Sequence, residues 1–458
     1  MTVSPPPGEA FLSYAEKLFS ISLTDIKGVI KDFHAEMEKG LLGHESSLKM
    51  LPSYVDRPTG SEKGRFIALD LGGSNFRVLA VELDGKGEID ILAVSKFAIQ
   101  KKVMQGTGVQ LFDFIAGCID LFLARNNMDR KRAYDLAFTF SFPVEQTDIA
   151  AGELIVWTKG FTSTGVEGKD IVTLLNQALR RKRIRDITVT ALANDTVGTL
   201  MARAYKDPTC DLGVILGTGT NACYREKRSN IRKLKGVHPE GHMIVNMEWG
   251  NFDKVRRTSY DTRLDEASVN PGAMYFEKMV SGMYLGEITR HVLVDAIARG
   301  LIFSNAPGAV ESFGERDSLK TEHMSLIERD GTTDLREVEG FFNTRGISNA
   351  TLDDRAFLKH VCQLVAARSA RLSAAAVSAV IAWMDPEPRE VHTVAIDGSL
   401  FEKYPGFETR MTDVLKELYG ETAEKIRLVH SKDGSGKGAA VMAAVAASAV
   451  KEEPMPNS

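Results

Sequence analysis

Cysteine is scarce in this sequence of 458 residues, and its spacing excludes two common kinds of site. The four cysteines are Cys118, Cys210, Cys223 and Cys362, and no two of them form a C-x-x-C pair. Structural zinc sites and disulfide frameworks both depend on cysteines at characteristic spacings. We therefore expect neither kind of site, and the scarcity of cysteine fits a reducing compartment.

Long runs of basic residues and long runs of apolar residues are also absent. Lys and Arg total 57 against 61 for Asp and Glu, and no basic run is long enough to line a nucleic-acid groove. No apolar stretch reaches the roughly 18 residues of a membrane span. Residues 1–9 are rich in proline and lack the basic residues and the apolar core of a signal peptide. These absences predict a cytoplasmic protein that binds neither nucleic acid nor a membrane.

Two glycine-rich turns are the most informative feature that is present. Each turn follows an apolar run, so the two halves of the chain read alike. The first turn is Gly72, Gly73, Ser74 and Asn75, and the second is Gly217, Thr218, Gly219, Thr220 and Asn221. Glycine lets the backbone approach an oxygen-rich ligand, and the hydroxyl and amide groups supply hydrogen-bond donors. Either turn alone reads as an ordinary hairpin. The pair, with Asp70 at the end of a strand, predicts a nucleotide held between them.

Two other glycine patterns imitate nucleotide motifs and are rejected. Residues 217–222 fit the dinucleotide fingerprint G-x-G-x-x-A, but the charged segment 223–228 does not read as the helix that the fingerprint opens. Residues 434–437 imitate a Walker P-loop, but Ser431 stands at its first glycine position and Gly438 replaces the magnesium-binding hydroxyl. We therefore expect neither a Rossmann domain nor a P-loop.

Hydrophobic periodicity predicts an α/β protein of two or three domains. Strands are expected at 66–71, 78–81, 89–97, 135–142, 187–191, 212–216, 243–247 and 391–396, and helices at 10–42, 108–125, 197–204, 275–299, 354–383 and 434–450. The last helix is rich in alanine. Its composition reflects either helix propensity alone or close packing of a small-residue face over a hairpin or a nucleotide.

Asn194 and Asp195 lie where a strand ends and a helix begins, which is where ligands meet α/β sheets. Phosphoryl transfer to an alcohol requires a carboxylate that accepts the hydroxyl proton, and Asp195 is the leading candidate for this base. Asn194 offers both a donor and an acceptor. The structural alternative for this junction is a helix N-cap.

Further polar side chains stand at strand ends and turns, where they can pair with the hydroxyl groups of a sugar. They are Ser141, Thr158, Lys159, Asn221, Glu248 and, on a predicted helix, Glu277. A buried hydroxyl left unpaired costs about 1 to 3 kcal/mol, so a sugar site gathers such groups. Each of them alone is explained as well by a solvated surface.

Two segments close to these residues carry a resemblance to a known family. Residues 136–144 (LAFTFSFPV) and 152–161 (GELIVWTKGF) are similar to the sugar-binding signature of the eukaryotic-type hexokinase family, which includes glucokinase. The resemblance extends from the N-terminal helix to the alanine-rich helix. Residues 305–345 match least, and we take no functional residue from them.

The resemblance implies an α/β fold of the two-lobed actin-like ATPase (ribonuclease H-like) type, with the active site in the cleft between the lobes. It implies a helical segment at 1–60 packed on the larger lobe, a smaller lobe at 61–195 and a larger lobe at 196–432. The helix in 433–458 would return to the smaller lobe.

The resemblance also implies roles for individual residues. Asp195 would be the general base, and Lys159 would assist it. The hexose would be held by Ser141, Thr158, Lys159, Asn194, Asp195, Asn221, Glu248 and Glu277. ATP would be held by Asp70, Gly72, Gly73, Ser74, Asn75 and Arg77, by Gly217, Thr218 and Gly219, and along the adenosine by Gly398, Ser399, Ser435 and Gly436. Mg²⁺ would be held by phosphates and water, without a protein ligand cluster.

The implied activity is ATP-dependent phosphorylation of a hexose at its 6-hydroxyl, the first step of glycolysis, with D-glucose as the expected substrate. The protein would act as a monomer or a homodimer. The alternative is a sugar-sensing or regulatory protein of the same fold with reduced catalysis. The presence of Asp195, Lys159 and both turns argues against this alternative. A bacterial repressor-type sugar kinase is disfavoured, because such proteins are shorter and carry a zinc-binding cysteine cluster.

Overall fold

Two β-sheets of similar construction organise the protein in the computed structural model, which describes residues 7–72, 75–129, 132–236, 238–306 and 308–452. The sheet of the smaller lobe has the order β4-β3-β2-β5-β8, and that of the larger lobe has the order β1-β11-β10-β9-β12-β13. In each sheet an antiparallel meander, β2-β3-β4 or β9-β10-β11, is joined by two parallel strands. The likeness of the two halves is therefore present in the strand pairing.

The strands alternate their side chains between two covered faces. The smaller-lobe strands are β2 (Lys63–Leu71), β3 (Asn75–Asp84), β4 (Ile89–Ala98), β5 (Tyr134–Phe140) and β8 (Ile187–Ala193). The larger-lobe strands are β1 (Leu51–Pro52), β9 (Cys210–Leu216), β10 (Thr220–Lys227), β11 (His242–Asn246), β12 (His392–Asp397) and β13 (Ile426–His430). A separate hairpin consists of β6 (Val144–Asp148) and β7 (Ala151–Leu154). The sequence predictions miss β1, β6, β7 and β13, which are short or carry little periodicity.

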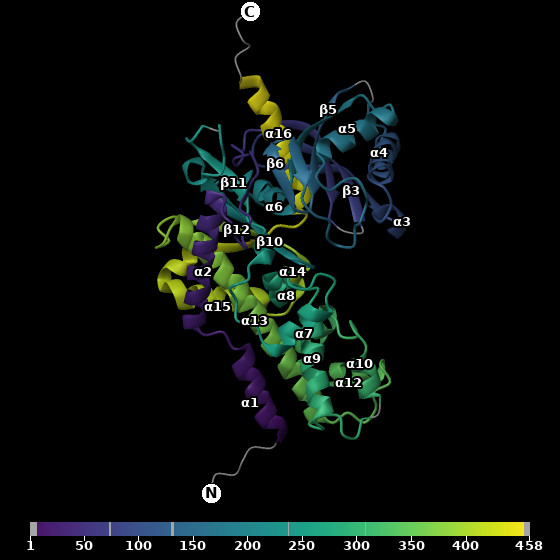
Figure 1. Ribbon diagram of the computed structural model, residues 1–458, viewed down its shortest axis with the longest axis vertical. Coiled ribbons are helices and arrows are strands. Elements are labelled where there is room, and N and C mark those ends of the chain that lie inside the picture. The colour runs from purple at the N-terminus through teal and green to yellow at the C-terminus, as the bar shows by residue number, and fades with distance from the viewer. Residues whose placement is uncertain (1–6, 73–74, 130–131, 237, 307, 453–458) are drawn as a thin grey trace, which may run out of the picture.

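Helices cover both faces of each sheet (Figure 1). In the first half they are α1 (Pro7–Phe19), α2 (Leu23–Leu42), α3 (Lys101–Met104), α4 (Gly108–Arg125), α5 (Ile171–Arg181) and α6 (Asp195–Ala204). In the second half they are α7 (Ser259–Ala267), α8 (Tyr275–Val280), α9 (Leu285–Ala298), α10 (Ala309–Gly314), α11 (Thr321–Arg329), α12 (Arg336–Asn343), α13 (Leu352–Met384), α14 (Ser399–Lys403), α15 (Phe407–Tyr419) and α16 (Gly434–Glu452). Short 3-10 helices are η1 (Arg228–Asn230), η2 (Trp249–Asn251) and η3 (Gly420–Lys425).

The N-terminal helices contribute to the larger-lobe core. Phe11 of α1 and Phe33 of α2 belong to the same buried cluster as Trp249 and Phe276. Side chains of α4 and α5 cover one face of the smaller-lobe sheet, and those of α6 and α16 cover the other. The lobe boundaries expected near residues 60, 195 and 432 stay predictions.

The long helix α13 corrects one expectation from the sequence. By length and composition it is apolar enough to cross a membrane, whereas no such stretch was expected. Its apolar window is 83% buried inside the protein, between α2, α9 and α15. The apolar composition of α13 is therefore accounted for by its place in the larger-lobe core.

Helices α6 and α16 pack so closely that glycine is required where they meet. A Cβ atom on Gly438 would lie 1.7 Å from the carbonyl oxygen of Gly198, and one on Gly198 would lie 2.7 Å from that of Ser435. The neighbouring Ala439, Ala440 and Ala443 are fully buried. The alanine-rich composition of α16 thus reflects close packing rather than helix propensity alone.

We expect Gly438→Ala to destabilise the protein, because the added methyl group meets backbone that cannot move aside without separating α6 from α16. Overpacking of this kind costs about 1 to 3 kcal/mol. Thermal denaturation of the variant should show a clearly lower Tm. The matched control is Gly117→Ala within α4, where an added Cβ meets nothing within 4 Å and the substitution favours the helix. Equal Tm values for the two variants would contradict the close contact.

The connections that leave the parallel strands carry most of the predicted site residues. Gly72 follows β2, Ser141 follows β5 and Asn194 follows β8 in the smaller lobe. In the larger lobe the turn at 217–219 follows β9, and Gly398 follows β12. Because the carboxyl ends of parallel strands meet at one edge of a sheet, each sheet presents these residues along a single edge.

Candidate active site

The predicted sugar-binding residues Asn194, Asn221 and Glu248 form one hydrogen-bonded network with Asn246. The Asn221 Nδ2 atom lies 3.3 Å from Asn194 Oδ1, 2.9 Å from Asn246 Oδ1 and 3.1 Å from Glu248 Oε1. The Nδ2 atom of Asn246 donates to Glu248 Oε1 at 2.9 Å. Three separate elements therefore place their polar side chains at one point.

Asn194 and Asp195 occupy the start of α6. Asn194 is the N-cap of this helix, and its Oδ1 accepts from the Thr196 backbone N–H at 3.0 Å. Asn194 therefore caps the helix, as the structural alternative predicted. The same side-chain oxygen also lies within hydrogen-bond distance of the Asn221 amide nitrogen. Asp195 is the first residue of the helix, where the unsatisfied N–H groups favour a negative charge.

Lys159 and Ser141 come from the two segments that carry the family resemblance. The Lys159 ammonium donates to the backbone carbonyl of Ser141 at 2.8 Å. Lys159 has a φ of 55°, a left-handed conformation that is uncommon for a residue with a side chain. No described contact joins the Thr158 side chain to the other predicted sugar-binding residues within the portion of the chain that the structure describes.

Glu277 reaches the second glycine turn from α8. Its Oε2 accepts from the backbone N–H of Thr220 at 3.0 Å. A Cβ on Gly219 would lie 2.6 Å from the same oxygen, so glycine is required there for the carboxylate to approach. The turn and the carboxylate are therefore positioned by each other.

Burial raises the pKa of three carboxyl groups around the predicted sugar site, those of Asp195, Glu248 and Glu277. Desolvation raises the pKa of Asp195, as does the negative charge of Asp70, while Lys159 and the Ser141 hydroxyl oppose the shift. The pKa of Glu248 is raised to about 7, again chiefly by desolvation. The pKa of Glu277 is also raised by desolvation, against the hydrogen bond from Thr220. A cluster of shifted carboxylates at strand ends is typical of a functional site.

The first glycine turn is tied to the beginning of α16. Arg77 on β3 donates to Asp70, to Asp433 Oδ1 at 2.7 Å and to Ser435 Oγ at 3.1 Å. The Ser435 hydroxyl in turn donates to Asp70 Oδ2 at 3.0 Å. Gly73 and Ser74 lie outside the described residues. For Asn75 the structure gives the backbone, as the first residue of β3.

The second glycine turn lies against the residues that follow β12. A Cβ on Gly217 would lie 3.4 Å from Gly398 Cα, and one on Gly398 would lie 2.3 Å from the Leu216 carbonyl oxygen. Gly398 has a φ of 130°, which side chains rarely tolerate. The Thr218 carbonyl accepts from the Met283 N–H at 3.1 Å. Ser399 is the first residue of α14 and lies beside the contact between Gly217 and Gly398. Gly436 lies in the first turn of α16.

Three residues near the site were missed from the sequence. Asp433 pairs with Arg77, and Asp397 Oδ2 accepts from the Gly434 N–H at 3.1 Å. Burial and the charge of Asp195 raise the pKa of Asp397 to about 6. Asn246 stands two positions before Glu248, the spacing that places side chains on one face of a strand. That spacing, and the place of Asp397 at a strand end, were available signals.

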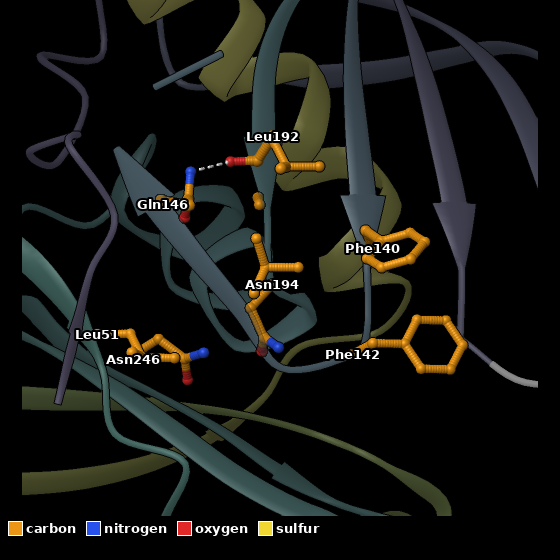
Figure 2. A pocket seen from close by; sticks show the side chains of 9 residues that line it. Leu51, Phe140, Phe142, Gln146, Leu192, Asn194 and Asn246 are labelled. Atoms are coloured by element: carbon orange, nitrogen blue, oxygen red, sulfur yellow. Dashed lines mark hydrogen bonds between the residues drawn. The ribbon is translucent and has the colours of Figure 1, made fainter. Parts of the chain in front are cut away.

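Asn194 and Asn246 of the hydrogen-bonded network line a small cavity (Figure 2). Its volume is about 10 Å³, and it is lined by Leu51, Phe140, Phe142, Val144, Gln146, Leu192, Ala193, Asn194 and Asn246. These residues come from both lobes, so the cavity marks where the lobes touch. A larger, shallow hollow of about 820 Å³ lies on α11 and α12 and contains none of the predicted site residues. Among the described residues, no group of three or more His, Cys, Asp or Glu side chains could hold a metal ion.

Together, the paired sheets and the turns at their strand ends define the class of the two-lobed actin-like ATPases, as the resemblance implied. Hexokinase sequence profiles match residues 12–205 and 211–445. Human hexokinase-1 is 43% identical over 431 residues, and rat hexokinase-3 is 41% identical over 438 residues. The chain belongs to the hexokinase family.

Solved structures agree with this assignment over nearly the whole chain. A Schistosoma mansoni hexokinase in complex with glucose superimposes with a TM-score of 0.86 at 36% identity, covering 95% of this chain and 99% of that one. A second hexokinase crystal structure gives a TM-score of 0.82 at 32% identity, covering 96% and 99%. The two curated relatives match 91% and 93% of this chain but 46% of their own length. The chain thus spans about half the length of those relatives.

Proposed function

We propose that this protein phosphorylates a hexose, with D-glucose as the substrate, at its 6-hydroxyl group with ATP. The observation that carries the proposal is the position of Asp195. This carboxylate stands at the N-terminus of α6, and the charges of Lys159 and of Asp70 at the end of β2 both act on it. Asp195 directly follows Asn194 of the hydrogen-bonded network, and its charge also acts on Glu248 and on Asp397 at the end of β12, which supports a position beside both predicted subsites. The glucose in the Schistosoma mansoni hexokinase structure supports the choice of sugar.

The hexose would be held by the predicted set of Ser141, Thr158, Lys159, Asn194, Asp195, Asn221, Glu248 and Glu277. Carboxylate and amide groups pair with neighbouring hydroxyls of a sugar, and burial makes each missing partner costly. Glu248 directs Oε1 to the two amides, which leaves Oε2 for a sugar hydroxyl. The network thus presents a preformed row of donors and acceptors.

The residues around the two turns fit a bound nucleotide. Close contacts of Gly217 with Gly398 and of Gly219 with Glu277 hold the second turn in place, and Arg77 places a guanidinium beside the first turn. Asp70, Gly72, Gly73, Ser74 and Asn75 would complete the first phosphate turn with Thr218 in the second, and Ser399, Ser435 and Gly436 would lie along the adenosine. Mg²⁺ would be bound through the phosphates and water. When bound, MgATP supplies the phosphoryl group and the charge that neutralises it.

In the proposed mechanism, Asp195 would accept the proton of the 6-hydroxyl group as that oxygen forms its bond to the γ-phosphorus of ATP, while the bond from this phosphorus to the oxygen that leaves with ADP breaks. The ionised form of Asp195 is required, and a raised pKa makes it a stronger base once it is ionised. Lys159 and Thr218 stabilise the negative charge that develops on the transferred group. The lobes on either side exclude water, which protects ATP from hydrolysis.

A coupled assay of ADP formation with glucose, mannose and fructose at fixed MgATP tests the proposal. We expect hexose-dependent ADP formation with formation of the hexose 6-phosphate, and little ADP without sugar. Sugar binding by calorimetry without any ADP formation would instead identify a sugar-sensing protein. The cytoplasmic location, the monomeric or homodimeric state and the lack of nucleic-acid and membrane partners stay predictions.

A further inference from the structure

Asn246 is a buried polar residue that the predicted sugar-binding set does not include. It is the last residue of β11, pairs with Cys223 of β10 and with Leu51 of β1, and is 6% exposed. Its place between two strands fixes its backbone on both sides. A buried amide in such a position requires partners for its donor and its acceptor.

The hydrogen bonds of Asn246 can be oriented without ambiguity. Asn221 Oδ1 accepts from the backbone N–H groups of Ala222 and Trp249, so the amide nitrogen of Asn221 is the atom that faces Asn246. The Asn246 atom that lies 2.9 Å from Glu248 Oε1 is therefore its amide nitrogen. Its Oδ1 atom is then the acceptor, and it receives the Asn221 amide at 2.9 Å. One side chain therefore uses its donor on one predicted sugar-binding residue and its acceptor on another.

Glu248 needs such support because its backbone leaves the regular strand. Its φ of 53° is left-handed, and η2 begins directly after it. The Trp249 N–H lies 3.3 Å from Asn221 Oδ1, and the Trp249 indole donates to Thr220 Oγ1 at 2.9 Å. These contacts fix the neighbouring residue, but only amide groups contact the Glu248 carboxylate among the described hydrogen bonds.

The surroundings of Asn246 leave its side chain little freedom. In Figure 2, Asn194 and Asn246 approach the same small cavity from different elements, with Leu51, the β1 partner of Asn246, beside it. The cavity of about 10 Å³ has room for about one water molecule. The free space beside the Asn246 side chain is therefore small.

We propose that Asn246 is a positioning residue that holds the Glu248 carboxylate and the Asn221 amide in the arrangement that receives the hexose. The inference rests on the proposed function, since it concerns the same sugar site. Asn246 acts through Glu248, so it sets sugar affinity rather than the rate of phosphoryl transfer.

The proposed role of Asn246 should be visible in how sugar affinity depends on pH. The pKa of Glu248 is about 7 because burial, Asp195 and Glu277 raise it, whereas Lys159 and the hydrogen bond from Asn246 lower it. Removing the Asn246 donor raises the pKa further. If sugar binding requires ionised Glu248, acidification should weaken binding at a higher pH in the variant than in the wild-type protein.

Asn246→Asp is the sharpest variant, because it keeps the volume and the acceptor for Asn221 while replacing the donor to Glu248 by a carboxylate. We expect the hexose KM and Kd at neutral pH to rise about 10- to 150-fold, the value of a hydrogen bond to a charged group. The kcat and the KM for ATP should change little. In a plot of hexose affinity against pH, the decrease on the acid side (the acid limb) should occur at a higher pH than in the wild-type protein.

Asn246→Ala and a matched control separate positioning from a general structural role. Gln146→Ala enlarges the same cavity, but Gln146 donates to the Leu192 carbonyl at 2.8 Å, and none of its described hydrogen bonds reaches a predicted sugar-binding side chain. Both variants should lower Tm, and only Asn246→Ala should raise the hexose KM. Similar effects of the two variants on hexose KM would overturn the proposal.

A double-mutant cycle with Glu248→Gln identifies the residue through which Asn246 acts. In the Glu248→Gln background, we expect Asn246→Ala to add little further loss of hexose affinity, because the carboxylate is already gone. Additive effects, or an unchanged acid limb in Asn246→Asp, would overturn the positioning role. A wild-type protein that neither binds a hexose nor forms ADP would instead overturn the proposed function.

Discussion

Asp195→Asn will lower kcat about 10²- to 10⁴-fold, the usual contribution of a positioned general base. The substitution keeps the volume of the side chain and its place at the start of α6 but cannot accept the hydroxyl proton. Glucose affinity should change far less, because the amide can still pair with a sugar hydroxyl. Single-turnover or steady-state measurement of ADP formation gives kcat, and calorimetry gives the glucose Kd.

The role of Asp195 as the general base also predicts the direction in which kcat changes with pH. Burial and Asp70 raise the pKa of Asp195, so the fraction of ionised base, and with it kcat, falls as the pH is lowered through that raised value. The control is Asp113→Asn on α4, a surface carboxylate paired with Arg181 that should leave kcat unchanged. A folded Asp195→Asn protein with near-normal turnover would show that another group accepts the proton.

Glu248→Ala will weaken glucose binding by about 1 to 3 kcal/mol while leaving ATP affinity nearly unchanged. The lost carboxylate leaves a sugar hydroxyl without its acceptor and leaves the Asn246 amide nitrogen without the acceptor that it has in the described structure. Titration calorimetry with glucose and, separately, with MgATP measures both affinities.

The control for this variant is another buried glutamate of the same lobe. Glu226 on β10 accepts from the Tyr224 hydroxyl and the Trp383 indole, and it lies at the end of β10 away from Asn221. Glu226→Ala should lower Tm without changing glucose affinity. If Glu248→Ala weakens ATP and glucose equally, the loss comes from a disturbed lobe rather than from a sugar contact.

Local sequence signals predicted the parts of the site that lie within one element or one turn. The glycine turns after β2 and β9, and the strand-to-helix junction at Asn194 and Asp195, each carry their signal within a few residues. The pairing of Arg77 with Asp433 carries none, because the two residues stand far apart in the chain. Asn246 carries only its spacing of two residues from Glu248, since its other partner, Asn221, is distant. Likewise β13 is short, and only its parallel pairing with β12 makes it a strand.

The sequence by itself determined the two α/β halves, the paired turns and the membership of a family, since hydrophobic periodicity and short motifs act over neighbouring residues. Only the tertiary structure decided how Asn194, Asn221, Asn246 and Glu248 share one network, and how Gly198 and Gly438 bring two helices into contact. Hydrogen bonds and close packing act over a few ångströms, so they exist only after folding has joined residues that are distant along the chain.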